Sequence, residues 1–249
     1  MRRGHYIPGT TPPVEDGLIF FAPLTSNSID IVGGKTSIGE AISYDSNGAY
    51  FSNSSTNNNN LKYLCYEISE QELKSIKTIC CEFLCSSSYY DTQTVYCLGT
   101  AIRTPYASYN NVNGEGANRN YKGVWHYIDF FDYKYSSKTP PTSGWSIDAD
   151  DVTNTQISQN TWYKIAGCTY ASKQMSYCNG SKNYQKNYTD TFNAFNINAS
   201  PQTGHCYLTI GGRLFGSPKQ LTGYVRNVKM YTKEFTDAEL AAMTTLNAI

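Results

Sequence analysis

The sequence has little charge and no excess of either sign. Charged residues make up 16% of the 249 residues, against roughly 25% in an average globular domain. The 20 Lys and Arg residues balance the 20 Asp and Glu residues, so the formal net charge is zero. A neutral chain has no summed field that would attract nucleic acid or an anionic membrane. We therefore expect no nucleic acid among its partners.

Long apolar runs are also lacking. No segment approaches the ~18 apolar residues of a membrane span, and we expect no membrane insertion. The first residues include two arginines without the apolar stretch of a secretory signal behind them,. Their Pro and Gly content predicts an extended N-terminal arm over residues 1–16. This arm is either a free tail or an assembly element that docks on a partner through Arg2, Arg3, His5 and Tyr6,.

The eight cysteines form no CxxC pair and no Cys/His spacing of the zinc type,. Six of them, including Cys80, Cys81 and Cys85, lie within apolar runs that resemble strands. In such places Cys behaves as a small core hydrophobe. Neighbouring residues of a strand face opposite ways, so Cys80 and Cys81 should lie on opposite faces. We expect reduced, structural thiols and folding in a reducing cytoplasm.

What the sequence does contain is a series of short strand-like runs separated by turn residues. Within 76–87, Ile79, Cys81, Phe83 and Cys85 alternate with the period of a strand,. Asn179-Gly180 predicts a tight turn. Such a series predicts an antiparallel sandwich or barrel. The predicted strands are 17–24, 49–55, 76–87, 93–100, 161–170, 174–182, 206–212 and 223–232.

The end of the chain has a helical pattern instead. Thr236 and Glu239 form a T-x-x-E capping box,. Leu240, Met243 and Leu246 follow at intervals of three and predict a narrow apolar stripe,. We expect a short C-terminal helix that packs its stripe on the core.

The order of several motifs resembles a known family. Trp162-Tyr163 opens a strand, Tyr177 to Gly180 forms a "Y-x-N-G" turn, and "LTIG" begins at Leu208. "GYVRNVKMY" from Gly223 and "TDAEL" from Thr236 then follow. This series resembles the laminin-G-like, concanavalin-A-like superfamily over residues 17–246, most closely in the C-terminal third. The resemblance implies an all-β, antiparallel two-sheet jelly-roll sandwich with a short C-terminal helix, spanning residues 17–249.

Residues 101–155 match no part of that pattern and form a Tyr- and Asn-rich insert. Aromatic rings among amides suit saccharides, whose C–H faces pack on rings, and they suit a protein interface equally well. The alternative is that "GVWHYIDFFDYKY" is a strand with Val124 and His126 on one face and Trp125 and Tyr127 on the other. The candidate glycan- or partner-binding residues are Tyr106, Tyr109, Tyr121, Trp125, Tyr133 and Trp145.

Catalytic and metal-binding patterns are sparse. The sandwich glycosidases of this superfamily resemble one another in an E-x-D-x-x-E strand. That motif does not occur in this sequence,. We predict that the protein is not an enzyme. We expect no cofactor, and the one candidate Ca²⁺ site is the acidic cluster of Asp148, Asp150 and Asp151, for which a solvated loop is the favoured alternative,.

These features together predict a binding or structural module. A lectin-like sandwich with reduced thiols fits a bacteriophage virion protein, such as a capsid decoration, head fibre or tail component that faces host-surface glycans. Its partners would be other virion proteins or itself through the arm, and its location the virion. One alternative is a secreted or surface bacterial carbohydrate-binding module at an extracellular location. Another is a glycoside hydrolase or lyase with unrecognised catalytic residues.

Overall fold

The structure is a computed structural model. It describes most of the chain, in nine stretches. The described ranges are 15–52, 63–86, 92–101, 123–129, 134–138, 152–170, 173–187, 205–212 and 221–246.

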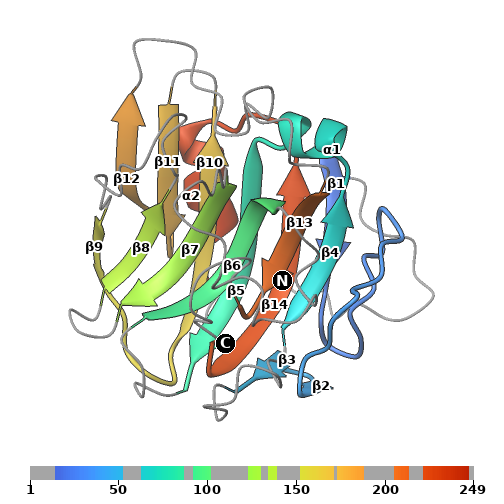
Figure 1. The fold of residues 1–249 in the computed structure, drawn as a ribbon. Coiled ribbons are helices and arrows are strands. Elements are labelled where there is room, and N and C mark those ends of the chain that lie inside the picture. The colour runs from blue at the N-terminus through green and yellow to red at the C-terminus, as the bar shows by residue number, and fades with distance from the viewer. Residues whose placement is uncertain are drawn as a thin grey trace, which may run out of the picture.

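Two antiparallel sheets form the described part of the molecule (Figure 1). The larger sheet has eight strands in the order β12-β11-β10-β5-β14-β3-β2, and β1 also pairs with β14. Its strands are β1 Leu18–Ala22, β2 Ser43–Asp45, β3 Gly48–Phe51, β5 Thr78–Cys85, β10 Trp162–Thr169, β11 Lys173–Cys178, β12 Ser181–Asn187 and β14 Gly223–Tyr231.

The second sheet has six strands in the order β4-β13-β6-β7-β8-β9. The predicted all-β, two-sheet antiparallel sandwich with a short C-terminal helix is confirmed. The strands of this sheet are β4 Leu64–Ile68, β6 Thr92–Ala101, β7 Gly123–Asp129, β8 Lys134–Lys138, β9 Val152–Gln156 and β13 His205–Ile210.

The core between the sheets follows from the alternation in β5. Ile79, Cys81, Phe83 and Cys85 all point into it, as the sequence predicts. Cys80 belongs instead to a second apolar cluster on the outer face of the larger sheet. All eight cysteines are buried thiols within strands. Six of them fill the two clusters as small hydrophobes, and Cys65 and Cys97 are buried outside both,.

Strand β14 contains a β-bulge that resets its alternation. Arg226 lies opposite Glu82 and Lys229 lies opposite Cys80, so three steps on β14 match two on β5. The extra residue is Asn227, whose φ of 54° lies in the left-handed region that Asn tolerates,. The bulge keeps the apolar residues of β14 facing the core on both sides of it.

The C-terminal helix α2, Asp237–Thr244, packs on β10, β11 and β12 (Figure 1). Both hydrogen bonds of the Thr236–Glu239 capping box are present. Leu240 is fully buried and Met243 packs beside it in the second cluster. The helix thus covers part of the outer face of the larger sheet, not the core between the sheets. Thr244 is buried too, because its hydroxyl donates to the Leu240 carbonyl and accepts from Gly180 N–H.

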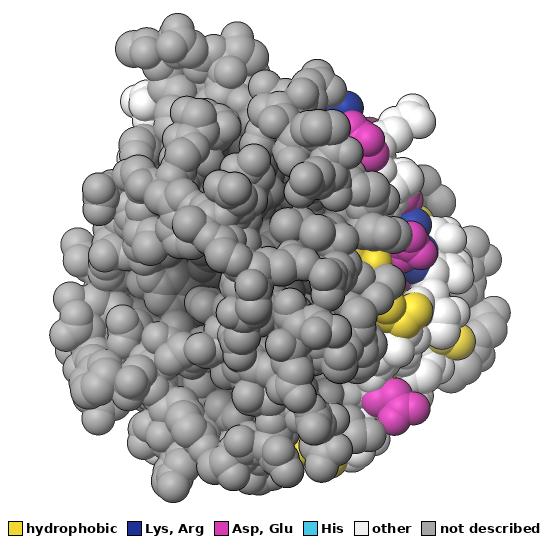
Figure 2. All heavy atoms as spheres, in the orientation of Figure 1, with side chains coloured by type: hydrophobic (Ala, Val, Ile, Leu, Met, Phe, Trp, Pro, Cys, Tyr) yellow, Lys and Arg dark blue, Asp and Glu magenta, His cyan; other side chains and the backbone are white. Residues whose placement is uncertain are grey.

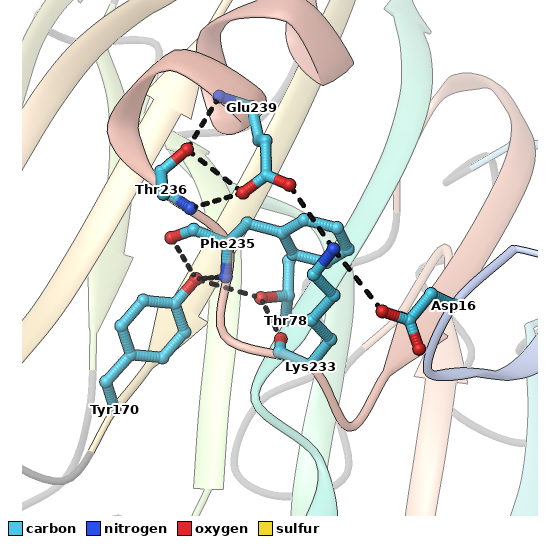
Figure 3. Close-up of polar contacts among 7 residues, drawn as sticks. All are labelled: Asp16, Thr78, Tyr170, Lys233, Phe235, Thr236 and Glu239. Atoms are coloured by element: carbon cyan, nitrogen blue, oxygen red, sulfur yellow. Dashed lines mark hydrogen bonds and ion pairs between the residues drawn. The ribbon is translucent and has the colours of Figure 1, made fainter.

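A polar network holds the segment before α2 in place (Figure 3). The Tyr170 hydroxyl accepts a hydrogen bond from Phe235 N–H at 2.7 Å and donates to the Phe235 carbonyl at 3.1 Å. The Oγ1 atom of Thr78 lies 3.4 Å from the same hydroxyl oxygen. Lys233 pairs with Glu239 of α2 and with Asp16. The start of the described chain and its terminal helix are therefore tied to the same strand end.

The chain enters the sandwich beside β14. Glu15 accepts hydrogen bonds from Lys229 and Tyr231. Burial raises the pKa of the Glu15 carboxyl, but these two bonds and the Lys229 charge outweigh burial, so its pKa lies below its ordinary value. Glu15 and Asp16, assigned from sequence to the arm, thus contact the sheet. Arg2, Arg3, His5 and Tyr6 lie outside the described residues.

The predicted Asn179-Gly180 turn is present, and a second short helix precedes β5. Asn179 and Gly180 both have positive φ, as the turn between β11 and β12 requires,. The short helix α1, Glu70–Ser75, has a capping box of Ser69 and Glu72. No described helix is long and apolar enough to cross a membrane.

The segment between β1 and β2 runs along the sandwich edge beside β4. Asp30 is fully buried and accepts three hydrogen bonds, from Phe21, Val32 and Gly33 N–H. Ile38 N–H donates to the Cys65 carbonyl and so pairs with edge strand β4. Figure 2 shows described hydrophobic and charged side chains at this margin of the molecule. Four of the segment's aliphatic side chains are exposed: Ile29, Val32, Ile38 and Ile42.

The first prediction concerns the second apolar cluster. Leu240→Ala removes a fully buried side chain and should lower the free energy of unfolding by about 3 kcal/mol,. Urea unfolding measures the change. The exposed Glu234→Ala is the matched control and should change it by less than about 0.5 kcal/mol,. A loss for Leu240→Ala no larger than the control's would show that α2 does not stabilise the sheet.

The second prediction concerns the Glu15 anchor. Its lowered pKa means that its stabilisation is fully present above the ordinary carboxyl pKa of about 4.3 and is lost as pH falls through the folded value,. Glu15→Gln should therefore destabilise at pH 7, and the difference from the unmodified protein should shrink towards zero in acid. Denaturant midpoints across pH measure this, with Glu234→Gln as control. A difference that grows in acid would refute the anchor.

Candidate functional site

The structure brings one of the predicted binding residues into the described fold. Trp125 lies in β7, and the predicted insert contributes β7, β8 and β9 to the six-stranded sheet. The segment expected as one strand is a pair of strands, with Trp125 opposite Lys138 of β8. The remaining candidates lie outside the described residues: Tyr106, Tyr109, Tyr121, Tyr133 and Trp145.

Trp125 continues a cross-strand row on the six-stranded sheet. Cys65 lies opposite Thr209, Thr209 opposite Cys97, and Cys97 opposite Trp125. Directly opposed residues share a sheet face. Cys65, Thr209 and Cys97 are outside the core cluster, yet all three are fully buried. This outward face is thus closed to solvent at Cys65, Thr209 and Cys97, whereas Glu67 on the same face of β4 is exposed.

The outer face of the eight-stranded sheet carries a more open set of side chains. Trp162 of β10 lies opposite Leu84 of β5, Leu84 opposite Tyr224 of β14, and Tyr224 opposite Tyr50 of β3. All four side chains are partly exposed. They form what we name the aromatic row, which crosses four strands at the end of the sheet away from α2. Gly223, next to Tyr224, has a φ of 153° and lies so close to the Leu84 carbonyl that no larger residue fits.

Trp162 is held by a stacked ion pair. The Arg226 guanidinium lies 3.9 Å from the centroid of the Trp162 ring. Arg226 Nε donates to Glu82 at 2.7 Å, and Asn227 Nδ2 donates to the other Glu82 oxygen at 3.3 Å. The Arg226 and Glu82 side chains are only 20% and 14% exposed. The guanidinium therefore lies against one face of the indole.

Tyr50 and Tyr224 form the other half of the row. Their ring centroids are 5.0 Å apart at an interplanar angle of 48°. The Tyr224 hydroxyl donates to Asp45 Oδ2 at 3.4 Å. Burial and the charge of Asp45 raise the pKa of Tyr224, so this hydroxyl stays protonated at neutral pH. The pair offers two ring surfaces with a polar edge.

A row of charged residues runs parallel to the aromatic row, two residues further along the strands. Lys164 of β10 lies opposite Glu82, and Glu82 lies opposite Arg226. Asp45 lies on β2, two residues beyond Ser43, which is opposite Tyr50. We name Lys164, Glu82, Arg226 and Asp45 the charged row. The two rows together give a face with ring surfaces beside hydrogen-bonding groups.

Sequence reasoning missed this surface. Trp162 was assigned only to a strand-opening motif, and Tyr50, Tyr224 and Arg226 to strands without a site. The available signal was alternation, because each of these residues neighbours an apolar core residue. The sequence does not show which strands lie side by side, because β10, β5, β14 and β3 are far apart in the chain.

A metal site finds no support in the described part of the chain. No three His, Cys, Asp or Glu side chains gather there as metal ligands. The predicted Ca²⁺ ligands Asp148, Asp150 and Asp151 fall outside the described residues.

Comparisons with known proteins support the fold class. No family model and no curated sequence matches the chain. Trypanosoma rangeli sialidase in complex with 2,3-difluorosialic acid has a TM-score of 0.60 at 13% identity, over 93% of this chain and 33% of the sialidase. Domain 4 of AbnA, a GH43 extracellular arabinanase from Geobacillus stearothermophilus, in complex with arabinotriose, has a TM-score of 0.51 at 13% identity. That match covers 93% of this chain and 100% of the domain.

These matches establish a shared β-sandwich fold. The chain spans about a third of the sialidase length, but the whole of the arabinanase domain. At 13% identity they show the fold alone.

The third prediction tests the ion pair beneath Trp162. A double-mutant cycle of Glu82→Gln and Arg226→Met should give a coupling energy of about 1–2 kcal/mol, because the pair is mostly withdrawn from water,. Urea unfolding of the four proteins measures it. The exposed pair Lys74–Glu70 is the control and should couple by about 0.3–0.5 kcal/mol,. Equal coupling energies for the two pairs would show that Glu82 does not hold the Arg226 side chain in place.

Proposed function

We propose that the protein is a non-enzymatic, carbohydrate-binding β-sandwich module that holds its ligand on the aromatic row. The observation that carries this is the partly exposed line of Trp162, Tyr224 and Tyr50 on one sheet face. Sugar C–H groups pack on aromatic faces, and an open sheet face leaves room for them.

The charged row supplies the polar half of recognition. Glu82 accepts a hydrogen bond from Arg226 Nε. The two Nη groups of the Arg226 guanidinium are then the donors for a ligand. Lys164 adds a further cation and Asp45 a carboxylate acceptor. Hydroxyl groups need both donors and acceptors, so this mixture suits a sugar better than an apolar ligand.

Two further considerations support the proposal. The arabinanase domain that the chain matches over its full length is in complex with arabinotriose, so its sandwich is described with a saccharide. The motif series that ends with Thr236 to Leu240 resembles the laminin-G-like superfamily, in which lectins occur. Within the proposal the chain is a laminin-G-like sandwich, and Trp125 with its aromatic neighbours in the insert forms a second candidate contact region.

The fourth prediction is a loss of saccharide binding on truncating the row. Trp162→Ala should weaken binding about tenfold or more, because one stacking surface disappears. Trp162→Phe should retain most of it. Screening on a glycan array followed by calorimetry with the best ligand measures the effect, and Lys182→Ala, on the exposed part of β12, is the control.

Two results would contradict the proposal. If no glycan binds, or if binding is unchanged by Trp162→Ala, the row is not a carbohydrate site. If a bound polysaccharide is shortened during incubation, and replacing one carboxylate stops this, the protein is the alternative hydrolase or lyase.

For the setting, we propose a bacteriophage virion, with the N-terminal arm as the assembly element. Supporting features are the low charge and the eight cysteines buried as thiols, which suit folding in a reducing compartment before release,. The alternative is a secreted or surface-attached bacterial module.

The fifth prediction tests the arm. The full chain should form an oligomer in light scattering, and a chain starting at Glu15 should be a monomer. This truncation keeps the contacts of Glu15 with Lys229 and Tyr231, so the sandwich remains anchored. An intact chain that is already monomeric would rule out self-assembly through the arm.

A further inference from the structure

The aromatic row has a length and a direction that select among saccharides. It crosses β10, β5, β14 and β3, at right angles to the strands. Neighbouring strands lie about 4.8 Å apart, so the row is roughly 14 Å long. Its members lie side by side on one sheet face. A ligand that uses the whole row is therefore an extended chain lying across the strands, and not a single sugar.

The charged row repeats on alternate strands. Lys164 lies on β10, Arg226 on β14 and Asp45 on β2, with β5 and β3 between them. On the intervening strand β5, Glu82 is used to hold Arg226. The Arg226 guanidinium reaches the Trp162 ring and the Asp45 carboxylate bonds the Tyr224 hydroxyl, so polar groups lie near both ends of the row. The same side of the row carries them throughout, so the bound chain meets them along one edge.

We infer that the aromatic row binds a ribbon-like glycan chain in which alternate sugar units present the same edge to the charged row. A chain with equatorial 1,4 links has this two-fold character, because each unit is turned over relative to the last. A helical chain turns its edge away after a short run. This inference rests on the proposed carbohydrate-binding function and names the class of its ligand.

The sheet twist restricts the ligand further. Adjacent strands rotate by roughly 20–25°, so the ring positions turn progressively from Trp162 to Tyr50. A rigid, flat polysaccharide crystal could not contact both ends of the row at once. A single soluble chain can twist with it. The ligand is therefore a separate chain in solution.

The experiment compares oligosaccharide series of two geometries on the full chain. The ribbon-like probes are β-1,4-linked glucose and N-acetylglucosamine oligomers, and the helical probes are α-1,4-linked glucose oligomers, each from one to six units. Calorimetry gives the affinities for the unmodified protein, Trp162→Ala, Tyr50→Ala and the conservative Tyr50→Phe. Thermal unfolding checks that each variant is folded.

The expected result has three parts. Affinity for one ribbon-like series should rise at least tenfold from one unit to the length that spans the row, and the helical series should show no such rise. Trp162→Ala and Tyr50→Ala, at opposite ends of the row, should each abolish the length dependence. Tyr50→Phe should keep it, because the ring and not the hydroxyl provides the stacking surface.

The opposite results separate this inference from the proposed function. If helical oligomers or single sugars bind as well as the ribbon-like ones, and Trp162→Ala still weakens them, the module binds carbohydrate but the chain geometry is wrong. If only Trp162→Ala has an effect and Tyr50→Ala has none, the ligand does not lie along the row. If neither series nor any glycan on the array binds, both the inference and the proposed function fail.

Discussion

The extra residue at Asn227 is the constraint on which both faces of the larger sheet depend. Strand β14 pairs with β3 through its first residues, with β1 through its last, and with β5 along most of its length. The bulge lets Val225 and Val228 both face the core although they are three residues apart,. Without it, alternation would bring either Val228 or Val225 to the surface. The same reset points Arg226 towards Trp162, and Lys229 towards Glu15 on the outer face.

The outer face is then divided by what covers it. Near the C-terminal end of β14, Tyr231 joins the second apolar cluster, and α2 covers that cluster with Leu240. Near its start, Tyr224 belongs to the aromatic row beyond the reach of α2. One strand thus supplies an anchor for the helix at one end and a ligand-facing ring at the other. The Arg226–Glu82 pair lies between them and is mostly withdrawn from water.

The sequence allowed the fold to be predicted wherever a local pattern is sufficient. Period-two alternation in β5 identified its two faces, and the T-x-x-E motif identified the capping box of α2. Thr244 was missed because its burial depends on the Gly180 N–H, which lies far away in sequence. The aromatic row was missed for the same reason, since its four residues come from four strands whose order a single sequence does not determine. The spacing from Val225 to Val228 did carry the signal of the bulge.

The shape of the row also bears on how the module would work. A row of partly exposed side chains on one sheet face would leave part of a bound chain in water, so a single contact of this kind is weak compared with an enclosed pocket,. Weak sites become effective when several copies are held together, because the later binding events are then intramolecular. An assembly element at the N-terminus would supply this, and Glu15 attaches the arm to the same sheet face that carries the row. The two proposals, a saccharide-binding row and an assembly arm, are therefore physically linked. Weak binding by a single row becomes effective when the arm holds several copies of the row together.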